Sequence, residues 1–188
     1  MIIGDYDKDY CMETSDIFLK YYLNNFKMKW DQASKLADYL GDYYSQDVLS
    51  CTAIQHKEVS DKISYVLNEL FENALKFNDE KDITASTHIN REDNLITLVT
   101  SNHIDEKKAE HFVAFLTQLF KGDPRTMFIE KIEQNLIDEN NNSGLGYLTM
   151  ILNFDVKLGF KFFTLNDQSG KVRIYTMARM PMLSTIEE

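Results

Sequence analysis

The chain has 188 residues, which is typical of one domain, and 44% of them are hydrophobic, enough to build a core. Its formal net charge of −10 repels nucleic acid, and Lys107 and Lys108 stand among acidic neighbours, so no basic patch offsets that charge. The sequence contains neither an apolar run long enough to span a membrane nor a signal peptide, so we expect a cytoplasmic protein without membrane or nucleic-acid partners.

The first half of the chain predicts one strand and two helices. Residues 1–15 have no periodic pattern and predict an irregular arm before a single domain over 16–188. Alternating apolar residues over 16–23 predict a strand, and apolar residues spaced by three or four from Trp30 to Tyr44 predict an amphipathic helix. After a connector, a second helix is expected from about Val59 to Phe77, with Ser60 as its N-cap.

The second half predicts two hairpins separated by helices. Segments 82–89 and 94–101 alternate as a hairpin, and the second is apolar on both faces, which is typical of a central strand. Two helical patterns, broken at 122–124, and a short helix after Gly146 precede a closing hairpin over 156–165 and 171–180. We predict an α/β (α+β) two-layer sandwich, with helices on one face of a mixed, largely antiparallel five-stranded sheet.

Three polar residues share one face of the second helix. Glu69, Asn73 and Lys76 are spaced at i, i+4 and i+7, which is usually the pattern of a solvated face. Asn73, however, is a middling helix former in mid-helix next to Ala74, which suggests a further role. Downstream, two glycines open a short helix, and such a turn lets backbone N–H groups approach a phosphate. This turn consists of Ser143, Gly144, Leu145 and Gly146.

These two motifs resemble those of the GHKL (Bergerat-fold) ATPase/kinase superfamily. The segment from Glu69 to Ala74 is similar to its N box, and 143–146 is similar to its Gly-rich G2 box. Within that superfamily the chain is most similar to the anti-sigma-factor serine kinases (RsbW/SpoIIAB type) and to the SiaB-type regulator kinases. The resemblance implies that Asn73 holds Mg²⁺ bound to ATP and that Glu69 is the general base. Lys76 and the glycine turn would place the phosphates.

The resemblance also implies a helical ATP lid over about 103–142 and an adenine-binding G1 box near 100–105. No glycine is present in that segment, which departs from the family pattern, and Asn102 stands where an Asp is expected. The Asn102 carboxamide can accept a hydrogen bond from the adenine amine and donate one to a ring nitrogen.

Two functions follow from the resemblance. The first is an ATP- and Mg²⁺-dependent serine/threonine protein kinase that acts on a small regulatory protein in a partner-switching pathway. The second is a non-catalytic interaction module with the same fold and a degenerate nucleotide site. The intact Glu69 and Asn73 favour the kinase, whereas the missing glycines favour the module. A homodimer is expected from the resemblance alone.

Overall fold

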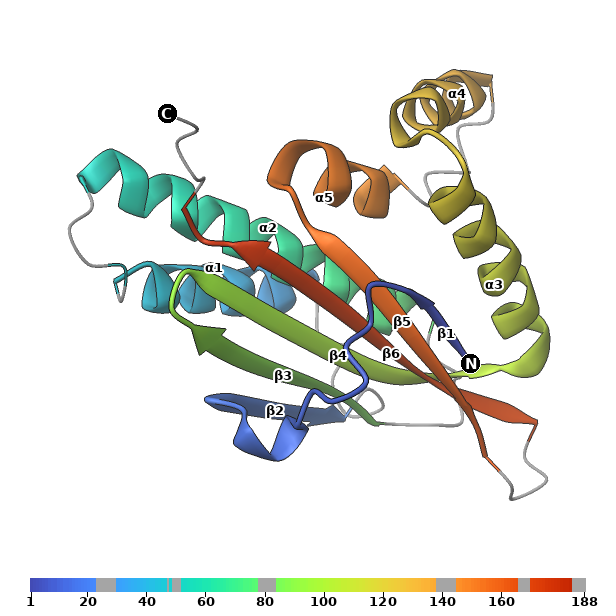
Figure 1. The fold of residues 1–188 in the computed structure, drawn as a ribbon, viewed down its shortest axis with the longest axis horizontal. Coiled ribbons are helices and arrows are strands. Elements are labelled where there is room, and N and C mark those ends of the chain that lie inside the picture. Colours follow the sequence, from blue (N-terminus) through green and yellow to red (C-terminus); the bar gives the residue numbers. More distant parts are fainter. Residues whose placement is uncertain are drawn as a thin grey trace.

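The computed structural model describes residues 1–22, 30–46, 48, 52–77, 84–137, 145–165 and 170–183. Figure 1 shows one sheet with the helices gathered on one of its faces. The strands are β1 (Ile2–Gly4), β2 (Ile17–Tyr22), β3 (Thr84–Glu92), β4 (Leu95–Asp105), β5 (Lys157–Thr164) and β6 (Lys171–Pro181). The helices are α1 (Trp30–Gln46), α2 (Ala53–Phe77), α3 (Glu106–Lys121), α4 (Pro124–Ile137) and α5 (Leu145–Phe154), with a 3-10 turn, η1, at Met12–Thr14.

The sheet has the strand order β1-β5-β6-β4-β3-β2, and all of its described pairs are antiparallel. The α+β sandwich class is therefore confirmed, although the sheet is neither five-stranded nor mixed. The expected central position of 94–101 is also confirmed, because β4 lies between β6 and β3. Its side chains are buried on both faces, since Ile96 and Leu98 join the main core whereas Val99 joins a small cluster on the opposite face.

Helix α2 lies across the sheet, and its apolar stripe fills the core between them. Ile63, Leu67 and Phe71 are fully buried there. The helix begins at Ala53, so the expected start near Val59 and the N-cap at Ser60 are wrong. Thr52 and Gln55 form a capping box, in which Thr52 Oγ1 accepts from the Gln55 N–H and Gln55 Oε1 accepts from the Thr52 N–H. Ser60 instead donates to Asp42 of α1, at 2.5 Å.

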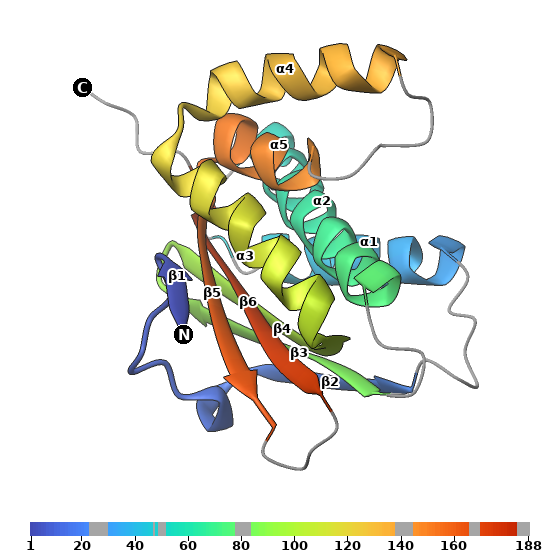
Figure 2. The ribbon, with the colours of Figure 1, turned by 90° about the vertical axis from the view of Figure 1, so that its right-hand side faces the viewer.

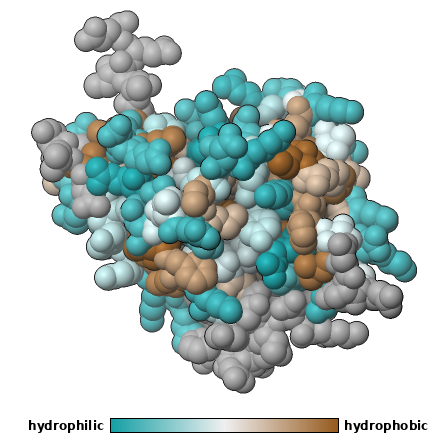
Figure 3. All heavy atoms as spheres, turned by 60° about the horizontal axis from the view of Figure 1, so that its bottom comes forward, coloured by the Kyte–Doolittle hydropathy of each residue, from teal (hydrophilic) through white to brown (hydrophobic). Residues whose placement is uncertain are grey.

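The N-terminal segment crosses the sheet face that the helices leave open (Figure 2). It starts as edge strand β1, paired with β5, so the arm expected to be irregular contributes the sixth strand. It then passes directly over Gly159, where a Cβ would overlap the backbone of Tyr6, and Tyr6 packs with Val99 and Met177. Figure 3, which turns the lower side of Figure 1 forward, shows apolar side chains in separate areas among hydrophilic ones.

The two helices of the expected lid differ in how deeply they pack. Asp105 ends β4 and caps α3 by accepting from the Lys108 N–H at 2.8 Å, so 103–105 belong to the sheet and not to a lid. Helix α3 buries Leu116 and Leu119 in the core. Helix α4 packs over α5 and exposes Ile129 (Figure 2). The remainder of the expected lid, 138–142, lies outside the described residues. No helix in the described part of the chain is both long and apolar enough to cross a membrane.

Candidate functional site

A cavity of about 440 Å³ lies on the helix-covered face of the sheet, within the size range of small-molecule sites. It is bounded by α2, the strands β4 and β6, α3, α4 and the start of α5. Its described lining residues are Leu70, Asn73, Ala74, Phe77, Thr100, Asn102, Ile104, Lys108, His111, Phe112, Phe115, Lys131, Tyr147, Ile174 and Thr176.

The inner part of the cavity, here called the floor, is uncharged and combines four polar side chains with two apolar ones. It consists of Leu70, Asn73, Thr100, Asn102, Ile174 and Thr176. Thr100 and Asn102 alternate along β4 and so point to the same face, and their register partners on β6 are Thr176 and Ile174. Asn102 is only 7% exposed. The structure thus brings together Asn73 and Asn102, which the sequence analysis selected from distant motifs.

The outer part, here called the rim, carries the lysines and the histidine of the described lining. Lys108 and His111 come from α3, where they share one face, and Lys131 comes from α4. None of the described residues that line the cavity is Asp or Glu. In a chain of net charge −10, this lining favours an anionic ligand.

The rim was missed by the sequence analysis because Lys108 was considered only with its acidic neighbours along the chain. A signal was nevertheless present in the helical spacing. Lys108, His111, Phe112 and Phe115 recur at i, i+3, i+4 and i+7, and all four line the cavity. Helical spacing therefore places these cations at the cavity, while the sequence neighbour Asp105 also pairs with Lys108, with Nζ 3.5 Å from Oδ2.

The candidate base Glu69 lies one turn before Asn73 and faces α5. Its carboxylate occupies the space that a Cβ on Gly146 would need. Burial raises the pKa of Glu69, and the nearby Glu72 raises it further, while a hydrogen bond from Tyr65 and the charge of Lys76 act in the opposite direction. Glu69 is not among the described residues that line the cavity.

Tyr65 connects Glu69 to α5 by a second route. Its hydroxyl is hydrogen-bonded to both Glu69 and Thr149, and its ring packs on Phe154 with centroids 4.9 Å apart. The pKa of Tyr65 is raised, chiefly by burial, so this hydroxyl remains a hydrogen-bond donor at neutral pH. Helix α5 therefore holds the Glu69 side chain through Gly146, Tyr65 and Thr149.

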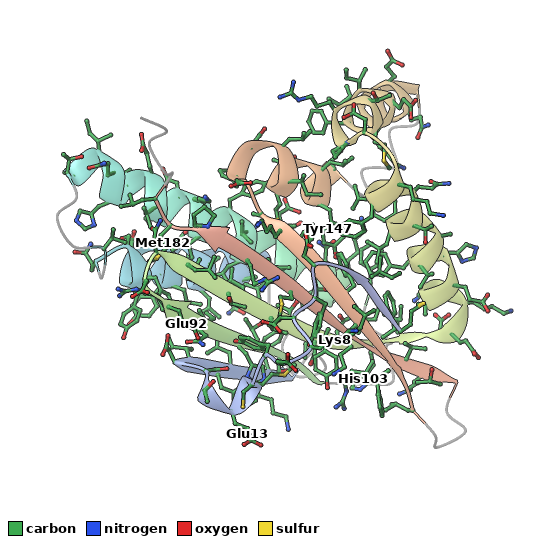
Figure 4. The ribbon with its side chains drawn as sticks, in the orientation of Figure 1. Lys8, Glu13, Glu92, His103, Tyr147 and Met182 are labelled. Atoms are coloured by element: carbon green, nitrogen blue, oxygen red, sulfur yellow. The ribbon has the colours of Figure 1, made fainter. Side chains whose placement is uncertain are left out.

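Tyr147 lies where α5, α3 and the sheet converge (Figure 4). Its ring packs against Phe112 and Phe160, and its hydroxyl is hydrogen-bonded to Thr176 of the floor. Burial is the main cause of the raised pKa of Tyr147. The hydrogen bond to Thr176 acts in the opposite direction, and the charge of Glu69 adds to the rise. Tyr147 therefore stays uncharged, and it connects the cavity to the surroundings of Glu69.

The remaining candidates are placed as follows. Lys76 is exposed, with its Nζ 5.4 Å from the centre of the Phe77 ring, and it is not among the described lining residues. Leu145 and Gly146 open α5, and Gly146 abuts Glu69. Ser143 and Gly144 lie outside the described residues.

The cavity combines uncharged hydrogen-bonding groups with cations, which matches a ligand that has a polar ring and negative charges. The amides and hydroxyls of the floor can form hydrogen bonds with such a ring, and the cations of the rim can attract the negative charges. In the part of the chain that the structure describes, no three or more His, Cys, Asp or Glu side chains are arranged to hold a metal. A Mg²⁺ ion here would therefore take Asn73 together with oxygens of the ligand and of water.

Comparison with known proteins supports the fold. No protein-family model matches the chain, and no curated protein matches it with significance. Among solved structures, the chain is similar to one chain of the SiaB–SiaC complex from Pseudomonas aeruginosa. The TM-score is 0.58 at 13% sequence identity, and the match covers 88% of this chain and 91% of the other. At this identity the two chains share a fold.

Proposed function

We propose that this protein is an ATP- and Mg²⁺-dependent kinase that phosphorylates a serine or threonine of a small regulatory protein. The observation that carries the proposal is the cavity itself. It combines Asn73 and Asn102 on an uncharged floor with Lys108 and Lys131 on a cationic rim, in an acidic protein. This combination suits a ligand with an aromatic base and several negative charges.

In this proposal, each group of residues has a separate task. The amide oxygen of Asn73 would hold Mg²⁺, which when bound supplies neutralisation of phosphate charge. Lys108 and Lys131 would attract and orient the phosphates, and Asn102 would bind the base. Phosphoryl transfer depends mainly on such positioning and charge stabilisation, so no covalent role for the protein is needed.

Glu69 would accept the proton of the partner's hydroxyl group. Its raised pKa brings the carboxyl nearer to neutral pH, which makes it a better base than an exposed glutamate. Its position one turn before Asn73 places it near the Mg²⁺ ligand along α2. Because Tyr65 and α5 hold the carboxylate, we expect its orientation to depend on α5.

We also propose that the protein binds a partner protein and acts in the cytoplasm. The similar solved chain is from a complex of two proteins, SiaB and SiaC, which supports a protein partner for this fold. The regulatory role in a partner-switching pathway and the homodimer remain predictions from the sequence resemblance.

The second candidate is a non-catalytic module that binds a regulatory protein without phosphorylating it. One observation favours it: the Glu69 carboxylate packs against Gly146 and is not among the described lining of the cavity.

Radiolabelled phosphate transfer from ATP to a purified partner that binds the chain separates the two candidates. For the kinase, Glu69→Ala should lower transfer by about 10²–10⁴-fold while ATP binding, measured in parallel, is kept or tightened. Loss of a carboxylate near the phosphates removes repulsion, so binding should not weaken. Absence of transfer by the wild type to a verified partner would favour the non-catalytic module.

A further inference from the structure

The polar groups on the cavity floor share one property: each can either donate or accept a hydrogen bond. The Asn102 amide has an NH₂ donor and a carbonyl acceptor, and the Thr100 hydroxyl can rotate to serve as either. The Thr176 hydroxyl is bonded to that of Tyr147, and this hydroxyl pair can reverse its direction. The described side chains of the floor therefore present no fixed pattern of donors and acceptors.

Backbone groups of the strands do not supply such a pattern. Strand β4 is paired with β3 on one side and β6 on the other, and β6 is itself paired with β5. Around Thr100 and Thr176 the backbone N–H and C=O groups of these strands are therefore used by the sheet. Recognition of a base beside Thr100 and Thr176 therefore depends on the side chains.

Adenine and guanine have the same ring system but opposite polarity at their six-position, an amine donor in adenine and a carbonyl acceptor in guanine. A fixed acceptor such as a carboxylate distinguishes them, because it binds the amine and repels the carbonyl oxygen. Neither Asp nor Glu is present among the described lining residues, and Asn102 can turn its amide to match either base.

We infer that the cavity does not discriminate between adenine and guanine, so the protein binds Mg·GTP about as well as Mg·ATP. This inference rests on the proposed function, since it concerns the nucleotide class taken by the same cavity. Asn102 is the residue that allows both bases to bind, because its amide is buried at the cavity, next to Thr100 and Ile104 on the same strand face.

Calorimetric titration of the full chain with Mg·ATP and, separately, with Mg·GTP tests the inference without any partner protein. The expected dissociation constants agree within about tenfold. A site with unmatched fixed polar groups would instead reject the wrong base by about 10⁴-fold. A preference of more than about 100-fold for ATP would overturn the inference and leave the proposed function intact.

Asn102→Asp adds a fixed acceptor at the same position. At about pH 8, where an aspartate with a moderately raised pKa is ionised, it should raise the preference for ATP over GTP by about 10- to 100-fold. The control is Asn90→Asp, which makes the same change on β3 on the opposite sheet face and should leave the preference unchanged. An unchanged preference in Asn102→Asp would contradict the assignment of this residue.

These measurements distinguish failure of the inference from failure of the proposed function. If Asn102→Asp does not fold, the wild-type comparison of the two nucleotides still decides the inference. If neither nucleotide binds the wild type, the proposed function fails and the inference fails with it. Binding of both with similar affinity supports both statements.

Discussion

The floor and the rim of the cavity are built differently although they face the same space. The floor is made by α2, β4 and β6, where Thr100 and Asn102 are buried and lie on a strand that is paired with β6. The rim is made by α3 and α4, where Lys108 and His111 are exposed. Exposed lysines act mainly through charge, whereas buried amides act through shape and hydrogen bonding. The floor should therefore determine which ligand binds, and the rim how strongly its negative charge contributes.

The largest effect should come from the floor. Asn73→Ala removes the proposed Mg²⁺ ligand and should weaken Mg·ATP binding by about 100-fold or more. Loss of a residue that only supports a metal ligand already lowers metal affinity by about 10–100-fold. Calorimetry measures this directly. Asn68→Ala is the matched control, because Asn68 lies on the same helix but is bonded to Glu72 at 3.1 Å. Equal binding by wild type and Asn73→Ala would mean that this face of α2 is not the nucleotide site.

At the rim we expect a smaller change that depends on salt. Lys108→Ala and Lys131→Ala should each weaken Mg·ATP binding by about tenfold at low ionic strength and by less at high salt, because charges in contact with solvent are screened. Lys107→Ala is the control, since Lys107 is adjacent in sequence but is not among the described lining residues. If Lys107→Ala and Lys108→Ala weaken Mg·ATP binding equally, the effect comes from the overall charge of α3 and not from the position of Lys108 at the cavity.

The sequence was informative for the floor and much less so for the rim. Mid-helix Asn73 and the buried strand carrying Asn102 both have local signals, and the fold brings them together. Lys108 has acidic neighbours in the sequence, and only its position on the α3 face shows that it reaches the cavity. β1 was missed because three residues are too few to show alternation, and its pairing with β5 is a long-range contact.

The start of α2 could not be predicted from the spacing of apolar residues alone. The apolar period begins near Val59, but Thr52 and Gln55 form a capping box that starts the helix earlier. The contact between Gly146 and Glu69 had no sequence signal, because it joins two helices through tertiary packing. The glycine turn predicted to bind phosphate is described only at Leu145 and Gly146.

The third prediction concerns Gly146 and connects the floor to α5. In Gly146→Ala, the new Cβ should displace the Glu69 carboxylate and lower the free energy of unfolding. Glu69→Ala removes the obstacle, so a double-mutant cycle should give a coupling of about 1 kcal/mol. Gly122→Ala, at the end of α3, serves as the control and should be additive with Glu69→Ala. Additivity of Gly146→Ala with Glu69→Ala would contradict the contact.

The smallest effect should be the pH dependence caused by Glu69. Because its pKa is raised in the folded state, the folded protein holds this proton more tightly than the unfolded chain does. Stability is therefore lost as pH rises from the unfolded pKa through the folded pKa. Glu69→Gln should be more stable than wild type at neutral pH, and this advantage should shrink as pH falls below the folded pKa. Denaturant unfolding at several pH values measures it, and a pH-independent difference would contradict the shift.

Thermal unfolding of the wild-type chain in a titration with Mg·ATP shows whether the cavity binds a Mg²⁺-nucleotide. We predict a saturable rise in the unfolding midpoint, corresponding to about 2.7 kcal/mol when the free ligand is 100 times its dissociation constant. An unfolding midpoint that stays unchanged up to millimolar Mg·ATP would contradict it.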